Sequence, residues 1–339
     1  MKIRIFGESH APEIGVEIEG VPKGTVIDGA ELQTFLDRRA PGNGQGGMST
    51  PRKEPDKVEF ESGIVRSDTS GEDAASPLLT TDGTTIRAVI KNTNTRPQDY
   101  ANVQTVPRPG HADYASWLQC GKIPTGGGKW SGRMTAPLCI AGGIALQILK
   151  RKGVTIAAKV VRCGGMDCGG ETPPPLDQSP AGDSVGGIVE VVATGFPAGY
   201  GDVGTDGLES KLAAAFFGIP AVKGVEFGDG FKLADLLGSQ ANDAFAISES
   251  GESVKRVVLK TNHCGGMLGG VSVGMPIVAR LAFKPTPSIE IEQDSDDLAT
   301  MTPAKITVKG RHDRCVAFRG AVAAEAAMAI VLAGEMVRG

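Results

Sequence analysis

Glycine constrains this chain more than any other feature of its sequence. The chain has 48 glycines in 339 residues, about twice the usual frequency of roughly 7%, and they follow no collagen-like repeat. Because glycine adopts backbone angles closed to other residues and lets the backbone approach a ligand closely, this abundance predicts many tight turns and ligand-binding loops. Four loops are especially rich in glycine, at residues 42–47, 126–128, 163–170 and 264–270. None of them has the spacing of a Walker A loop or of a dinucleotide-binding fingerprint.

Composition narrows the class of protein. Hydrophobic residues make up 40% of the chain and charged residues 22%, which is ordinary for a globular protein and argues against wholesale disorder or a coiled coil. The net charge is −4, so broad nucleic-acid binding is not expected, because it usually needs a basic face. A site for a small anion needs only a local cluster of cations and is compatible with this balance.

The sequence also predicts where the protein resides. The longest apolar run, at 321–333, is interrupted by Glu325 and is shorter than the roughly 20 residues of a membrane span. The N-terminus resembles a strand and lacks the apolar core of a signal peptide. We therefore expect a soluble, cytoplasmic protein with no membrane partner. The six cysteines form no C-x-x-C pair, and we expect them to be reduced and structural.

Four helices are expected from capping residues and apolar periodicity. Asp28 followed by Glu31 predicts one helix start. Asp206 with Glu209 predicts a second start, for a helix that stops at Gly218. Longer helices are expected over 131–152 and 320–337.

Strand-like segments are interspersed with these helices. They are expected at 2–6, 16–19, 58–64, 85–90, 155–161, 187–193, 254–259, 271–283 and 305–308. This mixed order indicates an α/β (α+β) fold. No internal repeat or linker divides the chain, so we expect residues 1–339 to form a single domain.

All four histidines lie in loops dense in glycine and polar residues, where function is more common than in the scaffold. They are His10, His111, His263 and His312. No pair has the spacing of a zinc-binding motif, so general acid–base chemistry suits them better than metal binding, since an unperturbed imidazole titrates near about 6.5. A surface or backbone-bonded role is the alternative for each of them.

Cations gather beside the histidines. Arginine binds phosphate and carboxylate through a planar fork, and lysine acts more as a point charge. The glycines at 126–128 also run into the helix expected at Ser131, where free N–H groups would favour an anion. The pattern predicts an anionic ligand and acid–base chemistry, without naming the reaction. The cations concerned are Arg38, Arg39, Arg52, Lys53, Arg108, Lys129, Arg133, Lys284 and Arg311.

A series of motifs resembles the chorismate synthase family, in order and at similar separations, from about Gly7 to the final helix. The most distinctive are RPGHADY at 108–114 and VKGVEFGDGF at 222–231. The others are GESH at 7–10, RR at 38–39, PRKEPD at 51–56, GSQ at 238–240, NHCGG at 262–266, KPT at 284–286 and RHD at 311–313.

The resemblance implies a fold, a reaction and partners. The fold would be a β-α-β sandwich, assembled as a homotetramer. The reaction would be the lyase conversion of 5-enolpyruvylshikimate 3-phosphate to chorismate and phosphate by 1,4-elimination, the last common step of the shikimate pathway to aromatic amino acids. It would require bound reduced FMN. Because no NAD(P)H fingerprint is visible, we expect an external flavin reductant.

The resemblance also implies roles for particular residues. His10 would protonate the departing phosphate, His111 would act near flavin N1, and Asp313 with Ser9 would assist proton transfer near N5. Three arginines would clamp the substrate anions: Arg39, Arg108 and Arg133. The flavin would contact Lys129, Trp130, Ser131, Ala241, Asn242, Gly269, Lys284, Pro285, Thr286, Pro287, Ser288 and Arg311, while His263 and His312 would belong to the site wall.

Several positions depart from the family pattern. Ala40 and Gln45 stand where arginines are common, and Lys129-Trp130 replaces an Arg-Ser pair. Because the three expected proton handlers are present, we predict a competent enzyme with altered affinities. The alternatives are a divergent, non-catalytic relative that binds flavin or phosphate, and a metal hydrolase that uses histidine and cysteine.

Overall fold

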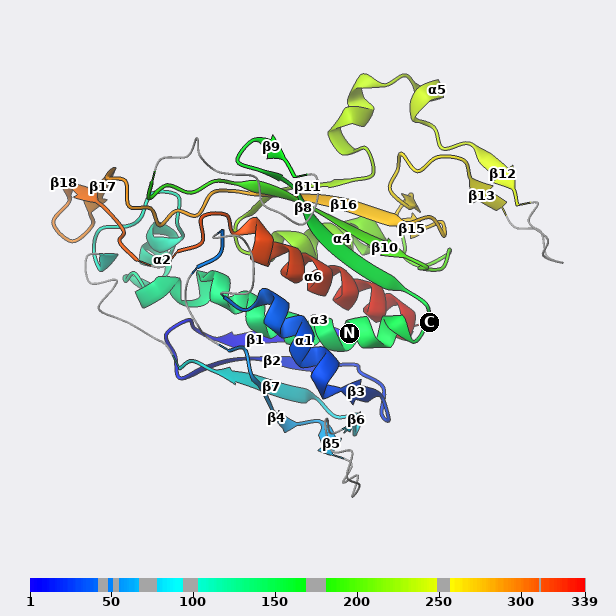
Figure 1. The fold of residues 1–339 in the computed structure, drawn as a ribbon, viewed down its shortest axis with the longest axis horizontal. Helices are drawn as coiled ribbons and strands as arrows, with labels where there is room; N and C mark the ends of the chain where they lie inside the picture. The colour runs from blue at the N-terminus through cyan, green and yellow to red at the C-terminus, as the bar shows by residue number, and fades with distance from the viewer. Residues whose placement is uncertain are drawn as a thin grey trace.

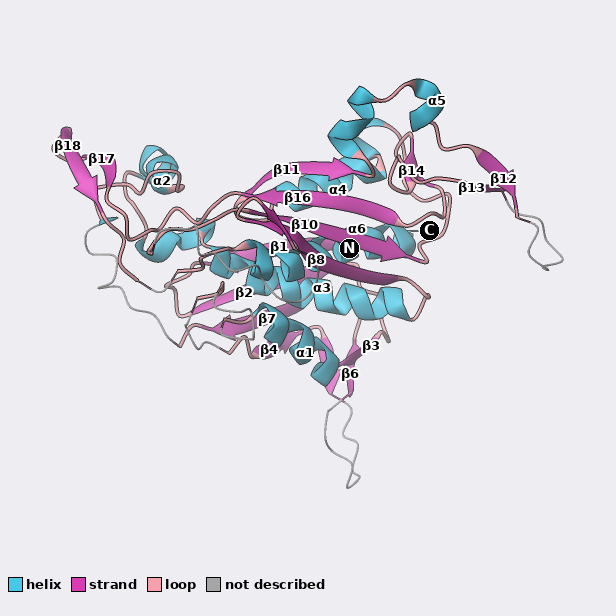
Figure 2. Ribbon diagram, turned by 45° about the horizontal axis from the view of Figure 1, so that its top comes forward, coloured by secondary structure: helices cyan, strands magenta, loops and turns pink. Residues whose placement is uncertain are grey.

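Two antiparallel sheets enclose a layer of helices in the computed structural model of the chain (Figures 1 and 2). The structure describes residues 1–41, 48–50, 55–66, 78–93, 103–168, 181–248, 257–310 and 312–338. The first sheet has the order β1 (Lys2–Gly7), β2 (Glu13–Glu19), β7 (Ile86–Lys91), β4 (Val58–Ser62). The second has the order β11 (Val222–Phe227), β16 (Ile277–Phe283), β10 (Gly187–Thr194), β8 (Thr155–Cys163), β9 (Met166–Asp167). The expected β-α-β sandwich is confirmed.

The helical layer and the peripheral elements complete the fold. The helices are α1 (Gly29–Arg39), α2 (Asp113–Cys120), α3 (Thr135–Lys150), α4 (Leu208–Phe217), α5 (Gly238–Ala241) and α6 (Ala317–Arg338). The 3-10 turns are η2 (Thr125–Trp130), η3 (Gly132–Met134), η4 (Gly204–Asp206) and η5 (Gly230–Asp235). Short strands form three small ribbons and one three-stranded sheet: β12 (Phe245–Ile247) with β13 (Val257–Leu259), β14 (Met267–Leu268) with β15 (Val271–Ser272), β17 (Gln293–Asp297) with β18 (Thr302–Ile306), and β3 (Val26–Asp28) with β6 (Leu78–Thr81) and β5 (Ile64–Arg66).

The two central helices, α3 and α6, pack against each other and against opposite sheets: α3 against β2 and β7, and α6 against β8 and β10 (Figure 1). A side chain at Gly142 would clash with Ala326, so the helices approach closely because one presents a glycine and the other an alanine. Both are long and apolar enough to cross a membrane by composition alone, over 132–150 and 317–337, but 78% and 83% of these windows are buried inside the protein. The two helices are apolar because they form the core of the protein.

The helix starts differ in how well the sequence predicted them. Asp28 caps α1 as expected, accepting hydrogen bonds from the N–H groups of Ala30 at 2.8 Å and Glu31 at 3.0 Å. The start expected from Asp206 is wrong, because Asp206 lies in η4 and Gly207 occupies the cap position of α4 without a side-chain bond.

Two other boundaries shift for local reasons. The helix expected from residue 131 begins at Thr135, because the Ser131 hydroxyl accepts the Arg133 N–H at 3.3 Å and caps the 3-10 turn η3 first. The strand expected over 271–283 is divided into β15 and β16, which belong to different sheets. Gly274 lies between them with a φ of 80°, a backbone conformation that ends an extended strand.

Glu325 is a charged residue buried in the helical core. It is 2% exposed on α6, where its two carboxylate oxygens accept hydrogen bonds from both terminal nitrogens of Arg38 on α1, each at 2.8 Å. It also accepts the Ala158 N–H of β8 at 2.8 Å. One carboxylate therefore joins two helices and the second sheet.

Replacing Arg38 with methionine should destabilise the fold, because it leaves the Glu325 carboxylate buried without its counter-charge. We expect a loss of about 3 kcal/mol of unfolding free energy, measured by urea denaturation at fixed protein concentration. Arg4→Met is the matched control, because it breaks the pair with Glu17 from an Arg4 side chain that is 73% exposed. That change should cost less than about 1 kcal/mol. Equal losses in the two variants would contradict the role of Glu325.

Candidate active site

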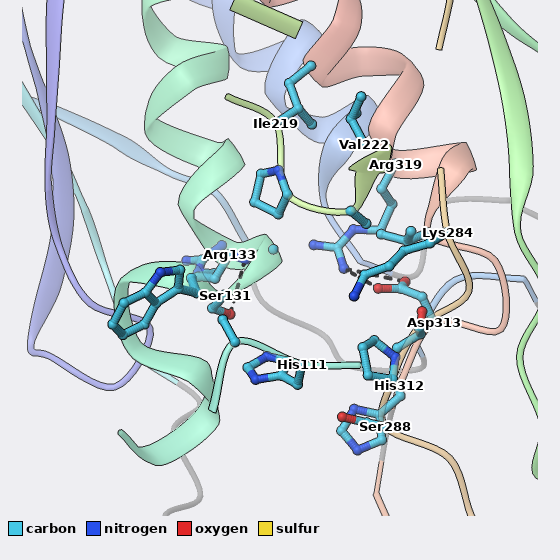
Figure 3. Close-up of a pocket in the computed structure, with 18 of the residues that line it drawn as sticks. His111, Ser131, Arg133, Ile219, Val222, Lys284, Ser288, His312, Asp313 and Arg319 are labelled. Atoms are coloured by element: carbon cyan, nitrogen blue, oxygen red, sulfur yellow. Dashed lines mark hydrogen bonds and ion pairs between the residues drawn. The ribbon is translucent and has the colours of Figure 1, made fainter. Parts of the chain in front are cut away.

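One cavity of about 590 Å³ lies at the end of the sandwich where α2 and the start of α3 meet (Figure 3). This volume is within the range of about 300–1,000 Å³ that small-molecule sites occupy. Its wall comes from the loop before α2, the 3-10 turns before α3, the loop after α4, the loop after β16 and the segment before α6. Of the residues expected in the site, the wall includes Arg108, His111, Lys129, Trp130, Ser131, Arg133, Lys284, Thr286, Pro287, Ser288 and Asp313.

The glycines at 126–128 pack against two histidines, of which His111 lines the cavity and His10 lies outside its lining. All three have positive φ angles, of 62°, 87° and 52°, which favour glycine. A side chain at Gly126 would clash with the His10 ring, and one at Gly127 would come within 3.0 Å of the His111 ring. Glycine is therefore required here to let both imidazoles approach one turn of backbone.

Asp113 holds His111 and Arg108 together. Its carboxylate is fully buried, accepts from Arg108 Nε at 2.7 Å, and lies 2.6 Å from His111 Nδ1. Burial alone would raise the pKa of this carboxyl, but the hydrogen bonds from Arg108 and His111 outweigh it and hold the pKa well below its usual range. Because an ionised carboxylate only accepts, His111 Nδ1 carries the donated proton.

His111 itself is neutral at pH 7. Burial lowers the pKa of the imidazole, the hydrogen bond to Asp113 partly offsets this, and the neighbouring Arg108 charge lowers it further. Arg108 also donates from Nη2 to the other oxygen of Asp113 at 2.8 Å and from Nη1 to Ser288 Oγ at 3.0 Å. The cluster is therefore rigid before any ligand binds.

Arg133 faces the cavity and Arg39 lies behind it. The buried Asp56 carboxylate is shared between them: it accepts from Arg39 Nε at 2.7 Å and pairs with Arg133 Nη1. Burial raises the pKa of Asp56, but the two guanidinium groups lower it more, so the carboxyl stays ionised. The substrate clamp expected of Arg39 is not what the structure shows, because Arg39 is 0% exposed and also bonds Thr135. Arg39 instead supports the Asp56–Arg133 pair.

Asp313 points into the cavity beside Arg319 (Figure 3). Its carboxylate accepts the Thr50 N–H at 2.9 Å and lies 3.0 Å from Arg319 Nη1. The Ser9 hydroxyl, which we expected to work with Asp313, instead donates to the Gly126 carbonyl at 3.1 Å and lies 3.2 Å from His10 Nδ1. Ser9 and His10 therefore stand together behind the glycine turn.

Lysines add further positive charge to the cavity. Lys284 donates to the Gly110 carbonyl, and burial followed by repulsion from Lys223 lowers the pKa of its ammonium group. The Lys129 ammonium group lies 4.5 Å from the centre of the Trp130 ring. A polyanion could neutralise these charges together.

Some expected residues lie elsewhere. Ala241, Asn242 and Gly269 belong to the end of the molecule that carries α5, β14 and β15, distant from α2 in both views (Figures 1 and 2). Pro285 lies in the same loop as its neighbours in the wall but packs toward Gly186. Arg311, Arg52, Lys53 and Gln45 lie outside the described residues.

The two remaining histidines differ in whether they line the cavity. His312 lines the cavity, as expected. His263 does not: its Nδ1 lies 2.7 Å from Asp229 Oδ2, between η5 and β14. Reasoning from the sequence missed Arg319 and Lys223 as wall residues. Lys223 is part of the VKGVEFGDGF motif, so that motif could have suggested it.

The fold and this cavity are those of an α/β protein with a small-molecule pocket lined by arginine, lysine, histidine and aspartate side chains. Comparison with known proteins agrees. The chorismate synthase family model matches residues 1–337. A chorismate synthase of Lancefieldella parvula is 42% identical, over 98% of this chain and 93% of that protein. One of Caulobacter vibrioides is 40% identical, over 99% and 93%.

A crystal structure of a chorismate synthase superposes with a TM-score of 0.70 at 23% identity, over 99% of this chain and 91% of that one. This likeness shows the shared fold. The chain belongs to the chorismate synthase family. Membership confirms the resemblance, the enzyme class and the reaction expected from the sequence.

The imidazole of His111 should titrate below its ordinary range, and Asp113→Asn should move its pKa further down. The substitution removes the hydrogen-bonded carboxylate that raises the pKa and leaves the Arg108 charge unopposed. NMR of histidine-labelled protein can follow this, since the chain has only 4 histidines. Asp229→Asn, beside His263, is the control and should leave the His111 titration unchanged. An upward shift in Asp113→Asn would refute this electrostatic arrangement.

Proposed function

We propose that this cavity converts 5-enolpyruvylshikimate 3-phosphate to chorismate and inorganic phosphate while reduced FMN is bound beside the substrate. The observation that carries the proposal is the meeting of His111, Asp313, Arg108, Arg133 and Lys284 around one cavity. The substrate has a phosphate and two carboxylates, which match this concentration of cations. In the reaction one C–O bond to phosphate breaks, one ring C–H bond breaks, and no net oxidation occurs.

The cavity suits FMN by shape and charge. A side chain is excluded at Gly126, which leaves bare backbone at that point of the wall, and the cavity volume is adequate for a flavin with a small substrate. The residues that would hold the cofactor are Lys129, Trp130, Ser131, Lys284, Thr286, Pro287 and Ser288. When bound there, reduced flavin would supply electron density that eases loss of the phosphate.

Different side chains of the protein have separate roles in proton transfer and binding. His10, held by Ser9 behind Gly126, gives a proton to the leaving phosphate oxygen. His111, kept neutral by burial, holds the cofactor's polar edge through its ring nitrogen. Asp313, fixed by two N–H donors, is the acceptor for the proton that leaves the substrate ring. Arg108 and Arg133 orient the substrate anions.

An exposed apolar surface at the far end of the sandwich supports the proposal that the protein is a homotetramer. The described residues from η5 to β13, at 230–248 and 257–259 and hereafter the arm, project from the body of the molecule (Figures 1 and 2). It exposes large apolar side chains, with Phe231 83%, Leu237 68% and Phe245 67% exposed. Such a surface is typical of a protein interface. In the tetramer we propose, the arm of one copy brings Ala241 and Asn242 to the flavin of another.

Two further points complete the proposal. The enzyme works in the cytoplasm, where its pathway intermediates are soluble. Its flavin is reduced by a separate reductase, since the sequence has no nicotinamide-binding fingerprint.

His10→Ala should lower kcat by about 10²–10⁴-fold, because the leaving phosphate loses its proton donor. The assay follows chorismate and phosphate under anaerobic conditions with chemically reduced FMN. FMN affinity, measured by visible difference spectra, should change little. His263→Ala is the control and should retain turnover. Folded wild-type protein that makes no product from the substrate with reduced FMN would reject the proposed reaction, and the non-catalytic alternative would then hold.

Phe245→Asp should dissociate the tetramer, because it places a charge on the exposed apolar surface of the arm. Light scattering after size exclusion measures the mass. FMN affinity should fall with it, since the partner's Asn242 is withdrawn. Val65→Asp, also on an exposed apolar side chain but on the opposite sheet layer, is the control. If Phe245→Asp keeps four chains together and binds FMN normally, the arm is not the interface.

A further inference from the structure

Arg319 is a buried cation that no step of the proposed reaction uses. It lies in the first turn of α6 with a side chain that is 13% exposed, at the wall of the cavity. Its Nη1 lies 3.0 Å from Asp313 Oδ2 and 3.4 Å from Oδ1 (Figure 3). Its Nε donates to the Arg39 carbonyl at 3.1 Å, at the last residue of α1. One guanidinium group thus connects the reacting carboxylate to two helices of the core.

We propose that Arg319 is a positioning residue that holds the Asp313 carboxylate ionised and in a fixed orientation toward the cavity. This inference rests on the proposed function, in which Asp313 is the proton acceptor. Arg319 acts through Asp313 and leaves the substrate anions to Arg108, Arg133 and the lysines.

The contacts explain why an arginine suits this position. The planar guanidinium presents donors in two directions at once, and a lysine has no such fork. One direction meets the carboxylate and the other meets the C-terminal end of α1, where carbonyl groups carry partial negative charge. Because both partners are electronegative, the guanidinium is compensated on each side although water is largely excluded.

The orientation of Asp313 is set from both sides. Arg319 donates mainly to Oδ2, while the Thr50 N–H donates to Oδ1 at 2.9 Å. Two donors on different oxygens stop rotation of the carboxylate about its last bond. An acceptor held still in this way avoids the cost of reorganisation at the moment of proton transfer. Without Arg319, the Thr50 N–H is the one donor to this carboxylate among the described residues, and the carboxylate is held less firmly.

A rival role for Arg319 is direct binding of a substrate anion, since it lines the cavity. The two roles differ in kinetics. A residue that binds substrate and transition state alike raises KM when it is removed, whereas one that acts only in the chemical step lowers kcat. The two roles also differ in how substitutions of Arg319 and Asp313 combine. An effect of Arg319 that passes through Asp313 disappears when Asp313 is replaced by the neutral Asn.

The test uses the full-length protein with four variants: Arg319→Met, Arg319→Lys, Asp313→Asn and the double variant Arg319→Met/Asp313→Asn. We expect Arg319→Met to lower kcat by about 10²-fold, the scale of one acid–base group, with KM within about threefold. Arg319→Lys should recover about tenfold of that loss, since it keeps the charge and loses the fork. The double variant should be no slower than Asp313→Asn. Arg87→Met, which breaks ion pairs with Glu17 and Glu61 on the opposite sheet, should retain wild-type kcat.

A second readout needs neither turnover nor cofactor. Thermal unfolding of the apo-protein should show the double variant melting no lower than Arg319→Met, because the first change already removes the shared interaction. This readout does not depend on the proposed reaction. If the wild-type enzyme made no chorismate, the reaction would be rejected, but the melting temperatures of the variants would still test the interaction between Arg319 and Asp313. If Arg319→Met does not fold, the same cycle is run with Arg319→Lys.

Three outcomes would overturn the proposal. The first is a tenfold or larger rise in KM with kcat preserved in Arg319→Met, which would make Arg319 a substrate ligand. The second is a kcat loss in the double variant equal to the product of the two single losses. The third is additive lowering of the melting temperatures.

Discussion

The pairing of each buried arginine with a carboxylate is the interaction on which this site depends. A pocket for a polyanion must gather cations, but buried cations repel one another and lose their hydration. The structure meets this constraint with ion pairs. Asp113 pairs with Arg108, Asp56 pairs with both Arg39 and Arg133, and Asp313 pairs with Arg319. Removing any one carboxylate would leave an uncompensated charge in the wall, so the site and the fold around it are stabilised by the same contacts.

This arrangement also explains the rigidity of the wall. Arg108 is held by Asp113 and Ser288, and Arg133 by Asp56 and Asn92, so the donors are oriented before the ligand arrives. A preorganised site loses less free energy in ordering side chains when the ligand binds. The carboxylates come from outside the helical core, while Arg39, Arg133 and Arg319 lie at the end of α1, in the turn before α3 and at the start of α6. Packing of these helices therefore fixes the spacing of the charges.

Reasoning from the sequence located the loops of the site but not the contacts within them. His111, Lys284 and Asp313 could be predicted because their motifs are distinctive and local. The burial of Arg39 could not, because a charged residue at a helix end is ordinarily solvated and only the fold shows that Asp56 and Thr135 cover it. Ser9 was paired with the wrong partner for the same reason, since its bond to the Gly126 carbonyl joins residues 117 positions apart.

Lysines and arginines take different parts in this cavity. Among the described residues, the wall arginines are engaged by carboxylates, whereas Lys129, Lys223 and Lys284 are in no salt bridge with the residues that the structure describes. The lysines therefore carry the excess positive charge that an incoming anion meets, and burial together with repulsion from Lys223 lowers the pKa of Lys284. An anion placed between these two ammonium groups would relieve that repulsion and favour protonation of Lys284. The arginines therefore form the frame of the site, and the lysines supply the positive charge that this frame leaves over.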